Sequence, residues 1–348
     1  MTLLASLFAT ALALAALCLL GLVLVTLVVA LRVSRALPPR GGFVDLGSTR
    51  LHYVEKGEGP AIVMIHGLGG QTGNFEHSLL DRLSDSFRVV LVDRPGSGYS
   101  TRRPGEMESM SAQAAAIAAL IDRLGLERPL VVGHSLGGGV ALALALDHPR
   151  ATSGLALLSP LTHMPDEVPK ALAKLALRSA LARRLVAWTI ATPLGLRGGR
   201  RTLDMVFAPD APPEDFGLKA GGLMALRPAS FVAASADLVA LESELPRLMA
   251  RYEELSVPVA ILFGRGDTIL DPEIHGERMV AAHPATRLDL VEGGHMLLVS
   301  QPDLVADWIR DCAARFAREP ATERLGMTTQ RSAVAGTFPS DLIERSAP

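Results

Sequence analysis

Apolar residues follow three patterns along the chain, and each pattern predicts a different kind of element. The first is one uncharged apolar run from Thr2 to Leu31. The second is a set of short continuous runs rich in β-branched and aliphatic residues, such as 61–65, which is typical of strands covered on both faces. The third is a set of longer, helix-like stretches such as 109–124. Because short and long runs alternate, they predict an α/β fold with a mostly parallel sheet and helices on both faces.

Eight of the short runs are predicted strands. The first two alternate in polarity and lie close together, so they predict a hairpin. The predicted strands are residues 43–47, 51–55, 61–65, 87–92, 129–132, 154–158, 257–263 and 286–291. Together they predict an eight-stranded sheet in one domain that extends over residues 43–318.

A long insertion separates the sixth predicted strand from the seventh. Almost a hundred residues lie between 158 and 257, whereas a parallel crossover needs only about a dozen. The excess, about residues 161–236, predicts a helical insertion that forms a lid.

The first part of this insertion is basic. Residues 168–201 contain eight Lys or Arg residues and no acid. Lys170, Lys174 and Arg178 recur at a spacing of four, which predicts one basic helical face. The pattern is lost by Trp188, so two helices are expected here. A basic, partly apolar surface of this kind is either solvated or rests on anionic lipid.

The N-terminal apolar run predicts a membrane anchor over residues 1–31. As a helix, its 30 uncharged residues extend about 45 Å at ~1.5 Å per residue, whereas the hydrocarbon core of a bilayer is about 30 Å thick. A secretory signal normally has a basic start and an apolar core of about 7–15 residues. A retained anchor is therefore favoured over cleavage, and residues 32–42 follow it as a basic linker rich in Pro and Gly.

The charges beside the anchor predict its orientation. Arg32, Arg35 and Arg40 all follow the apolar run, and no Lys or Arg precedes it. Basic residues within about 15–20 residues of a membrane span favour the cytoplasm. The domain that follows is therefore expected in the cytoplasm, facing the inner leaflet. If the run is instead a cleaved signal, the domain is exported.

Overall composition excludes several classes of function. The net charge of −2 gives no indication of nucleic-acid binding. Cys18 lies in the apolar run and Cys312 in a late helix, so neither a disulfide framework nor a thiolate metal site is expected. There is no H-E-x-x-H motif, and no metal is expected. The polar, aperiodic residues 319–348 predict a disordered tail.

The strongest chemical signal is the pattern G-x-S-x-G at residues 133–137. It lies between a predicted strand and a run of small, helix-favouring residues, so it predicts a nucleophile elbow with Ser135 as nucleophile. Gly133 and Gly137 lack a Cβ, which allows the strand and the helix to crowd a serine held in a strained conformation. The N–H of Leu136, at the start of the helix, is predicted to bind an oxyanion.

A second glycine-rich loop predicts the partner of this oxyanion donor. The strand at 61–65 ends in the sequence HGLGG, and an H-G-x-G loop in this position predicts that the N–H of Leu68 is the second donor. His66 is expected to be a structural loop residue rather than a proton carrier. The loop at 93–100 is also expected to be structural, with Asp93 as a cap.

The nucleophile needs a base, and the base needs an acid that fixes its tautomer. In this arrangement the chain order is Ser, acid, His. Asp267 follows the strand at 257–263 and His295 follows the last strand, so they are the predicted acid and base. Asp271 is expected to cap the next helix. His163, at the start of the insertion, is expected at the surface, or alternatively beside the substrate.

These motifs together resemble the α/β-hydrolase fold family. They occur in family order as HGLGG at 66–70, DRPGSGYS at 93–100, GHSLGG at 133–138, GRGD at 264–267 and GGH at 293–295. With its N-terminal run, the chain is similar to the membrane-anchored monoacylglycerol lipases of that family. The resemblance implies a serine hydrolase without a cofactor. Haloalkane dehalogenases and epoxide hydrolases of the family carry Asp at the elbow, so Ser135 argues against both.

The residues and the resemblance lead to one expected function. We expect a hydrolase of carboxylic esters with apolar acyl or aryl groups, and monoacylglycerol-like lipids are the most specific substrate expected. A C–C bond hydrolase of aromatic ring-cleavage products would use the same three residues, and a perhydrolase is a further alternative. Outside the enzymes, the alternative is a module that only binds a small molecule.

Overall fold

A computed structural model of the chain describes residues 2–103, 108–164 and 175–318, and the tail predicted at 319–348 lies outside these ranges. Its centre is one eight-stranded sheet with the strand order β1-β2-β4-β3-β5-β6-β7-β8. The strands are β1 Gly42–Asp45, β2 Arg50–Lys56, β3 Ala61–Ile65, β4 Arg88–Val92, β5 Leu130–His134, β6 Gly154–Leu158, β7 Val259–Gly264 and β8 Arg287–Val291. The predicted α/β class and eight-stranded, mostly parallel sheet are confirmed, and strand ends differ from the predicted ones by at most two residues.

The pairing of the strands places the loops that carry the predicted site residues at the carboxyl ends of the parallel strands. β1 and β2 are antiparallel, and so are β2 and β4, whereas all pairs from β4 to β8 are parallel. β3 lies between β4 and β5, so the chain order reverses direction beside β3. In open α/β sheets the crevice at the carboxyl ends of strands beside such a reversal is the usual place for a ligand. The loops after β3, β5, β7 and β8 all leave from these carboxyl ends.

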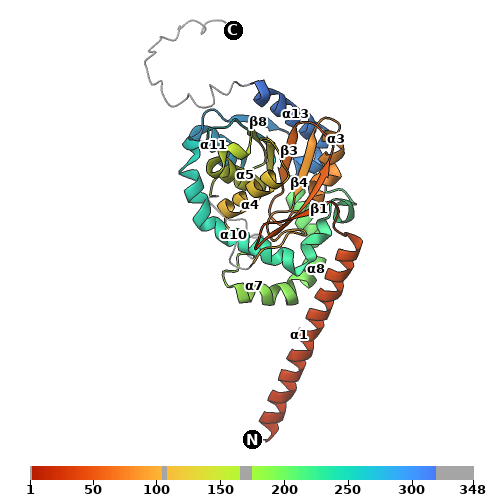
Figure 1. Cartoon of the computed structure of the whole chain (residues 1–348). Helices are drawn as coiled ribbons and strands as arrows, with labels where there is room; N and C mark the ends of the chain where they lie inside the picture. Colours follow the sequence, from red (N-terminus) through yellow and green to blue (C-terminus); the bar gives the residue numbers. More distant parts are fainter. Residues whose placement is uncertain (1, 104–107, 165–174, 319–348) are drawn as a thin grey trace, which may run out of the picture.

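Helices cover both faces of the sheet (Figure 1). One face packs on α4, α5, α10 and α11, and the other packs on α3, α12 and α13. α5 is apolar on all sides and almost completely buried, which is the pattern of a helix inside a core. The larger helices outside the insertion are α1 Thr2–Ala36, α4 Met110–Arg123, α5 Leu136–Asp147 and α13 Pro302–Arg318. The short helical turns are α2 Gly73–Phe75, η1 Glu76–Leu80, α3 Asp81–Leu83, η2 Pro149–Ala151, η5 Tyr252–Glu254, η6 Glu273–Glu277, α11 Arg278–Ala282 and α12 Leu297–Ser300.

The regular elements described in the insertion after β6 are all helices or helical turns, joined by loops such as residues 208–215. Its elements are α7 Ala180–Val186, η3 Ala187–Ala191, α8 Thr192–Phe207, α9 Phe216–Lys219, η4 Gly222–Leu226 and α10 Pro228–Met249. The long helix α10 also carries the chain back to the sheet, where its end packs in the core.

Two details of the insertion differ from the prediction. Arg178 does not lie on a helix, because the hydroxyl of Ser179 accepts the N–H of Ala182 and caps α7 after it. Lys170 and Lys174, predicted on the same face, lie outside the described residues. The expected break near Trp188 is not a break either. α7, η3 and α8 form one continuous helical run. The π-type turn at η3 widens the helix by about one residue per turn, so the spacing of exposed residues changes there.

The N-terminal helix α1 projects from one end of the domain (Figure 1). It continues to Ala36, so the first residues of the predicted linker 32–42 are helical. Residues 3–21 are exposed throughout, and Thr26 and Val33 are buried where the later turns of α1 pack against η3, α8 and η4. α1 is long and apolar enough to cross a membrane, a test that a signal sequence also passes.

Candidate active site

Ser135 occupies a strained turn between β5 and α5. Its φ of 54° and ψ of −121° lie in a region that side-chain-bearing residues rarely adopt. Two glycines make the turn possible. A Cβ on Gly133 would lie 2.6 Å from the carbonyl oxygen of Gly137, and a Cβ on Gly137 would lie 2.1 Å from the carbonyl oxygen of Ile65. The elbow therefore packs directly against the end of β3, as the glycine pattern predicted.

The side chain of Ser135 is not used to hold this turn together. Its hydroxyl does not cap α5, although the residue occupies the cap position. The backbone carbonyl of Ser135 instead accepts the N–H groups of Gly138 and Leu161, both at 2.9 Å. Ser135 is partly exposed, whereas its neighbours in β5 and α5 are buried. The hydroxyl is thus left available at the carboxyl edge of the sheet.

The structure brings the predicted acid and base into direct contact. Nδ1 of His295 donates to Oδ2 of Asp267 at 2.7 Å, and the two residues are 4% and 8% exposed. The other carboxylate oxygen of Asp267 accepts the N–H groups of Ile269 and Leu270 at 2.8 and 2.9 Å. These three hydrogen bonds fix the orientation of the carboxylate toward His295. Because the proton of His295 is held on Nδ1, Nε2 is left as the basic nitrogen.

Glycines also bring the loops after β7 and β8 together. A Cβ on Gly264 would lie 2.4 Å from the carbonyl oxygen of Gly293, so only glycine fits between the two loops. The N–H of Gly266 donates to the same carbonyl at 2.9 Å. The contact fixes the position of Asp267 relative to His295, since each residue lies within two positions of one of these glycines.

His134 joins the elbow to the loop that carries His295. Its Nε2 donates to the carbonyl oxygen of His295 at 3.1 Å, and the two rings lie 4.9 Å apart between centroids. Burial, and then the neighbouring His295, lower the pKa of His134 to about 3, so it stays neutral. The residue before Ser135 is thereby hydrogen-bonded to the residue predicted to act as its base. The sequence pattern did not indicate this contact.

The two predicted oxyanion donors lie on loops that meet at Ser135. A Cβ on Gly67 would lie 2.9 Å from Cβ of Ser135, so the loop of Leu68 closely approaches the serine. Within the described residues, neither the N–H of Leu68 nor the N–H of Leu136 donates to another protein group. Both donors are therefore available to a substrate oxygen.

His66 supports this loop with both ring nitrogens. Nδ1 donates to the carbonyl of Gly67 at 2.8 Å, and Nε2 accepts the N–H of Arg94 at 3.0 Å. Burial, and then the charge of Arg94, lower the pKa of His66 to about 4. The ring is therefore neutral, and each of its nitrogens has a hydrogen-bond partner.

Arg94, which the sequence motifs did not single out, holds the loop of Leu68 from inside the protein. It is fully buried, at 0% exposure. Its Nε donates to the carbonyl of His66 at 2.9 Å and its Nη2 donates to the carbonyl of Gly67 at 3.0 Å. In a trans peptide the N–H points opposite to the C=O. By holding the Gly67 carbonyl, Arg94 directs the N–H of Leu68 away from itself. The only sequence signal for this role is a charged residue inside the Gly-rich loop at 93–100.

The charge of Arg94 is balanced by an acid from the insertion. Nη1 of Arg94 donates to Oδ2 of Asp237 on α10 at 2.7 Å and to Gln113 on α4, also at 2.7 Å. The other oxygen of Asp237 accepts Nη1 of Arg102 at 2.6 Å. A buried Arg needs such a pairing, since an isolated buried charge is strongly unfavourable. Helix α10 is thereby connected to the loop of Leu68.

Two other sequence predictions are tested by their contacts. Asp271 accepts the N–H of Glu273 at 2.9 Å, as expected of a cap. His163 was predicted at the surface, which is wrong: it is 7% exposed. Its Nδ1 bonds to the Thr162 hydroxyl at 2.8 Å, and its ring packs edge-on against Tyr252. Tyr252 follows α10, so the return of the insertion covers His163.

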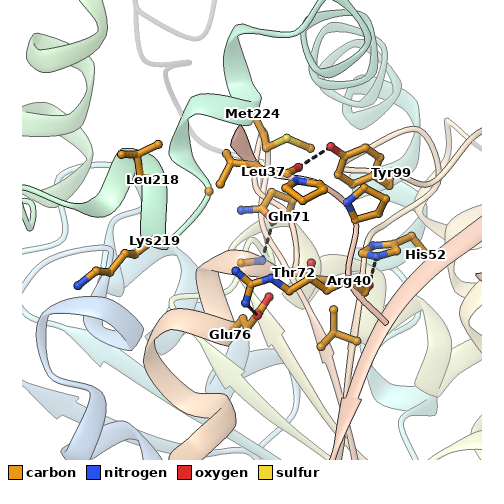
Figure 2. A pocket seen from close by; sticks show the side chains of 15 residues that line it. Leu37, Arg40, His52, Gln71, Thr72, Glu76, Tyr99, Leu218, Lys219 and Met224 are labelled. Carbon is orange, nitrogen blue, oxygen red and sulfur yellow. Dashed lines mark hydrogen bonds and ion pairs between the residues drawn. The ribbon is translucent and has the colours of Figure 1, made fainter. Parts of the chain in front are cut away.

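Figure 2 shows a pocket that lies apart from Ser135. It is lined by the chain after α1, the loop after β3 and part of the insertion. The hydroxyl of Tyr99 donates to the carbonyl of Leu37 at 2.5 Å (Figure 2). Gln71 donates to the carbonyl of Ala220, which is not drawn there, at 2.8 Å. The pocket is therefore a junction between three segments and not the candidate active site. Among the residues that the structure describes, no group of three or more His, Cys, Asp or Glu side chains is placed to hold a metal ion.

His52 connects this junction to the core. Its Nδ1 bonds to Oδ2 of Asp93 at 2.7 Å, and its Nε2 bonds to the carbonyl of Arg40 at 2.5 Å. The carboxylate of Asp93 also accepts the N–H groups of Thr72 and Tyr99, both at 2.8 Å. Acceptors at both ring nitrogens favour the protonated form of His52. Burial lowers the pKa of His52, but Asp93 and the Arg40 carbonyl outweigh burial and raise it.

The chain belongs to the α/β hydrolase fold family. The family's sequence model matches residues 60–302, which include the loops of Leu68, Ser135, Asp267 and His295. With this fold and family the protein is an enzyme, a hydrolase, which excludes the module that only binds a ligand.

Individual relatives cover the chain to different extents. It is 31% identical over 277 residues to 2-hydroxy-6-oxononadienedioate/2-hydroxy-6-oxononatrienedioate hydrolase 2 of Pseudomonas putida, covering 75% of this chain and 90% of the relative. It is 41% identical over 119 residues to a dihydrolipoyllysine-residue acetyltransferase component of the acetoin cleaving system of Cupriavidus necator. That match covers 34% of this chain and only 31% of the relative. Among solved structures, a bacterial membrane phospholipase A superposes with a TM-score of 0.61 at 23% identity, covering 91% of this chain and 99% of that chain.

Proposed function

We propose that the protein is a serine hydrolase of carboxylic esters. Ser135 is the nucleophile, His295 the general base and Asp267 the acid that orients it. The N–H groups of Leu68 and Leu136 bind the oxyanion. The observation that supports this most directly is the 2.7 Å hydrogen bond from Nδ1 of His295 to Asp267, because it leaves Nε2 as the basic nitrogen of a residue that is hydrogen-bonded to His134 of the elbow.

The reaction would proceed in two halves. Oγ of Ser135 attacks the ester carbonyl carbon while its proton moves to Nε2 of His295, and the carbonyl oxygen becomes an oxyanion held by the two N–H groups. Collapse of this intermediate expels the alcohol, which takes the proton from His295 and leaves an acyl group on Ser135. Water then attacks the acyl group, transfers a proton to His295, and the acid is released as Ser135 regains its proton.

We further propose esters with apolar acyl or aryl groups, and monoacylglycerol-like lipids in particular, as substrates. The large apolar surfaces of the insertion support this choice, and so does the fold shared with a membrane phospholipase A. The second candidate is a C–C bond hydrolase of ring-cleavage products. The relative from Pseudomonas putida favours this second candidate, because it is named as a hydrolase of such a product and the match covers 90% of its length.

We also propose that α1 is a retained anchor and that the catalytic domain faces the cytoplasm. The length and exposure of α1 support an anchor, and the positions of Arg32, Arg35 and Arg40 support the orientation. A C-terminal alkaline phosphatase fusion tests the orientation. An inactive fusion that stays in the membrane pellet after carbonate extraction is expected. An active fusion contradicts the cytoplasmic placement, and a shortened soluble protein contradicts the anchor.

A substrate panel tests the proposed chemistry. The full chain in detergent is assayed with p-nitrophenyl esters of increasing acyl length, monoacylglycerols and a vinylogous diketone of the ring-cleavage type. Turnover of the esters is expected, and Ser135→Ala and His295→Ala should each abolish it. Turnover of the diketone alone favours the C–C bond hydrolase. Ester turnover that survives either substitution at near the original rate contradicts the proposal.

A further inference from the structure

The helical run of α7, η3 and α8 exposes six large apolar side chains. These residues, named here the apolar face, are Leu181, Leu185, Trp188, Ile190, Leu194 and Leu196. Leu181, Leu185 and Trp188 follow a helical spacing on one side of α7 and η3. Leu181 is 77% exposed and Leu194 is 61% exposed, so the described part of the protein does not cover them. Large apolar side chains exposed together on neighbouring turns of one helical run indicate an interaction surface.

Basic side chains accompany the apolar face. Residues 175–203 contain no acid. Arg184, Arg197 and Arg201 are exposed, and no ion pair joins them to any residue that the structure describes. Apolar side chains together with Arg on a helix are suited to the interface of a bilayer with anionic headgroups.

The position of α1 places this surface at a particular depth. Residues 3–21 of α1 are all exposed, whereas Thr26 and Val33 are buried in the later turns, which pack against η3 and α8. Nineteen helical residues extend about 28 Å at ~1.5 Å per residue, which is close to the ~30 Å of a hydrocarbon core. If this exposed part of α1 spans the core, the turns from residue 22 onward leave it at the level of η3 and α8. Figure 1 shows α7 and α8 at the end of the domain from which α1 projects.

We propose that the apolar face is a membrane-contact surface that enters the interface of the same bilayer that α1 crosses. The apolar side chains lie among the upper acyl chains, and Arg184, Arg197 and Arg201 contact anionic headgroups. This inference rests on the anchor proposed above. It adds a second attachment, which fixes the orientation of the domain and keeps the insertion against the lipid that would supply an apolar substrate.

The two tryptophans of the chain allow a direct test. Trp188 belongs to the apolar face. Trp308 lies in α13 at the other end of the domain, is 8% exposed and donates to Asp289 at 2.7 Å. Trp308→Phe therefore leaves Trp188 as the only tryptophan, and Trp188→Phe is the matched control. The full chain is reconstituted into vesicles of equal parts phosphatidylcholine and phosphatidylglycerol, brominated near the headgroup end of the acyl chains.

The expected result is that both variants float with the vesicles and that only Trp188 is quenched, losing more than half of its fluorescence. Flotation without quenching of Trp188 overturns the membrane contact and leaves the anchor intact. Failure to float overturns the anchor and this inference together. Flotation without quenching, but with cross-linking between copies through a cysteine introduced by Leu185→Cys, assigns the face to a second copy of the chain and also overturns the proposal. None of these readouts depends on ester turnover, so they are separate from the proposed chemistry.

Discussion

Nη2 of Arg94 donates to the carbonyl oxygen of Gly67 at 3.0 Å. The carbonyl of Gly67 and the N–H of Leu68 belong to the same peptide group and point in opposite directions. By holding the carbonyl, the hydrogen bond therefore orients the N–H, which is the proposed oxyanion donor. Three donors converge on this carbonyl: Arg94, the ring of His66 and the N–H of Gly70. The loop is thus set in place before any substrate binds, which is what stabilisation of a developing charge requires.

Arg94→Lys tests this positioning role. Lysine keeps the charge that balances Asp237 but cannot make the forked contacts to the carbonyls of His66 and Gly67. Loss of a single oxyanion donor lowers kcat by about 10²–10³, and a misdirected donor should lower it by about 10-fold or more with little change in KM. Steady-state kinetics on a p-nitrophenyl ester measure the two constants separately.

Arg102→Lys is the matched control, since Arg102 also pairs with Asp237 but donates to the carbonyl of Ala233 instead of the loop. Its kcat should stay within a few-fold of the original, and the pH profile should be unchanged in both variants. If Arg94→Lys and Arg102→Lys have the same kcat, Arg94 only stabilises the fold.

Asp267→Asn should nearly abolish turnover while the protein stays folded. An Asn side chain can donate to Nδ1 of His295, which moves the ring proton to Nε2 and removes the base. The corresponding change in another serine hydrolase lowers kcat by about 10⁴, and a loss of roughly 10³–10⁴ is expected here. Asp271→Asn, which changes only a helix cap four residues away, should retain most activity. If kcat falls by a comparable factor in both variants, Asp267 only stabilises the conformation of its loop and does not orient His295.

Gly137→Ala tests the strain at the elbow through stability. The added Cβ would lie 2.1 Å from the carbonyl oxygen of Ile65, and backbone on both sides cannot move away easily. Overpacking typically costs about 1–3 kcal/mol, and a loss at the upper end of this range or beyond is expected. Gly198→Ala in α8 meets nothing within 4 Å and should instead stabilise the helix by about 0.5–1 kcal/mol. Chemical denaturation of both variants measures the difference, and equal stabilities contradict the packing argument.

The raised pKa of His52 predicts that part of the free energy of unfolding depends on pH. Because the pKa of His52 is raised on folding, its contribution is fully present below its unfolded pKa of about 6.5 and is lost as the pH rises through the folded value. The melting temperature should therefore fall as the pH rises above neutral. His52→Gln should remove this alkaline decrease, because it leaves nothing to titrate between Asp93 and Arg40. A decrease of the same size in His52→Gln would show that another group causes it.

The strands and the α/β class could be predicted from the sequence, because most strands are continuous apolar runs that end in glycine-rich loops. The positions of Asp267 and His295 followed from chain order and strand ends, and the structure places them in contact. Their roles in catalysis, and that of Ser135, stay predictions. The contact of His134 with His295 could not be anticipated, since 161 positions separate the two residues and its geometry depends on the packing of two loops.

Buried charges were the hardest features to predict. Arg94 and Asp237 are 143 positions apart, and in a sequence each resembles an ordinary surface charge. His163 was misjudged for a related reason, because Tyr252, which covers it, arrives only after the whole insertion. Arg178 was assigned to a helix from its spacing, whereas the cap at Ser179 starts that helix later. In each case the burial of the residue or the start of the helix was determined by a contact distant in sequence or by a local cap, and the periodic pattern of the sequence contains neither.

The most direct test of the proposed chemistry is the site of covalent labelling by a fluorophosphonate probe. The full chain is incubated with the probe, digested and mapped by mass spectrometry. One adduct on Ser135 is predicted, absent from Ser135→Ala and formed much more slowly in His295→Ala. An adduct on another residue, or labelling that persists in Ser135→Ala, would contradict the assignment of Ser135 as the nucleophile.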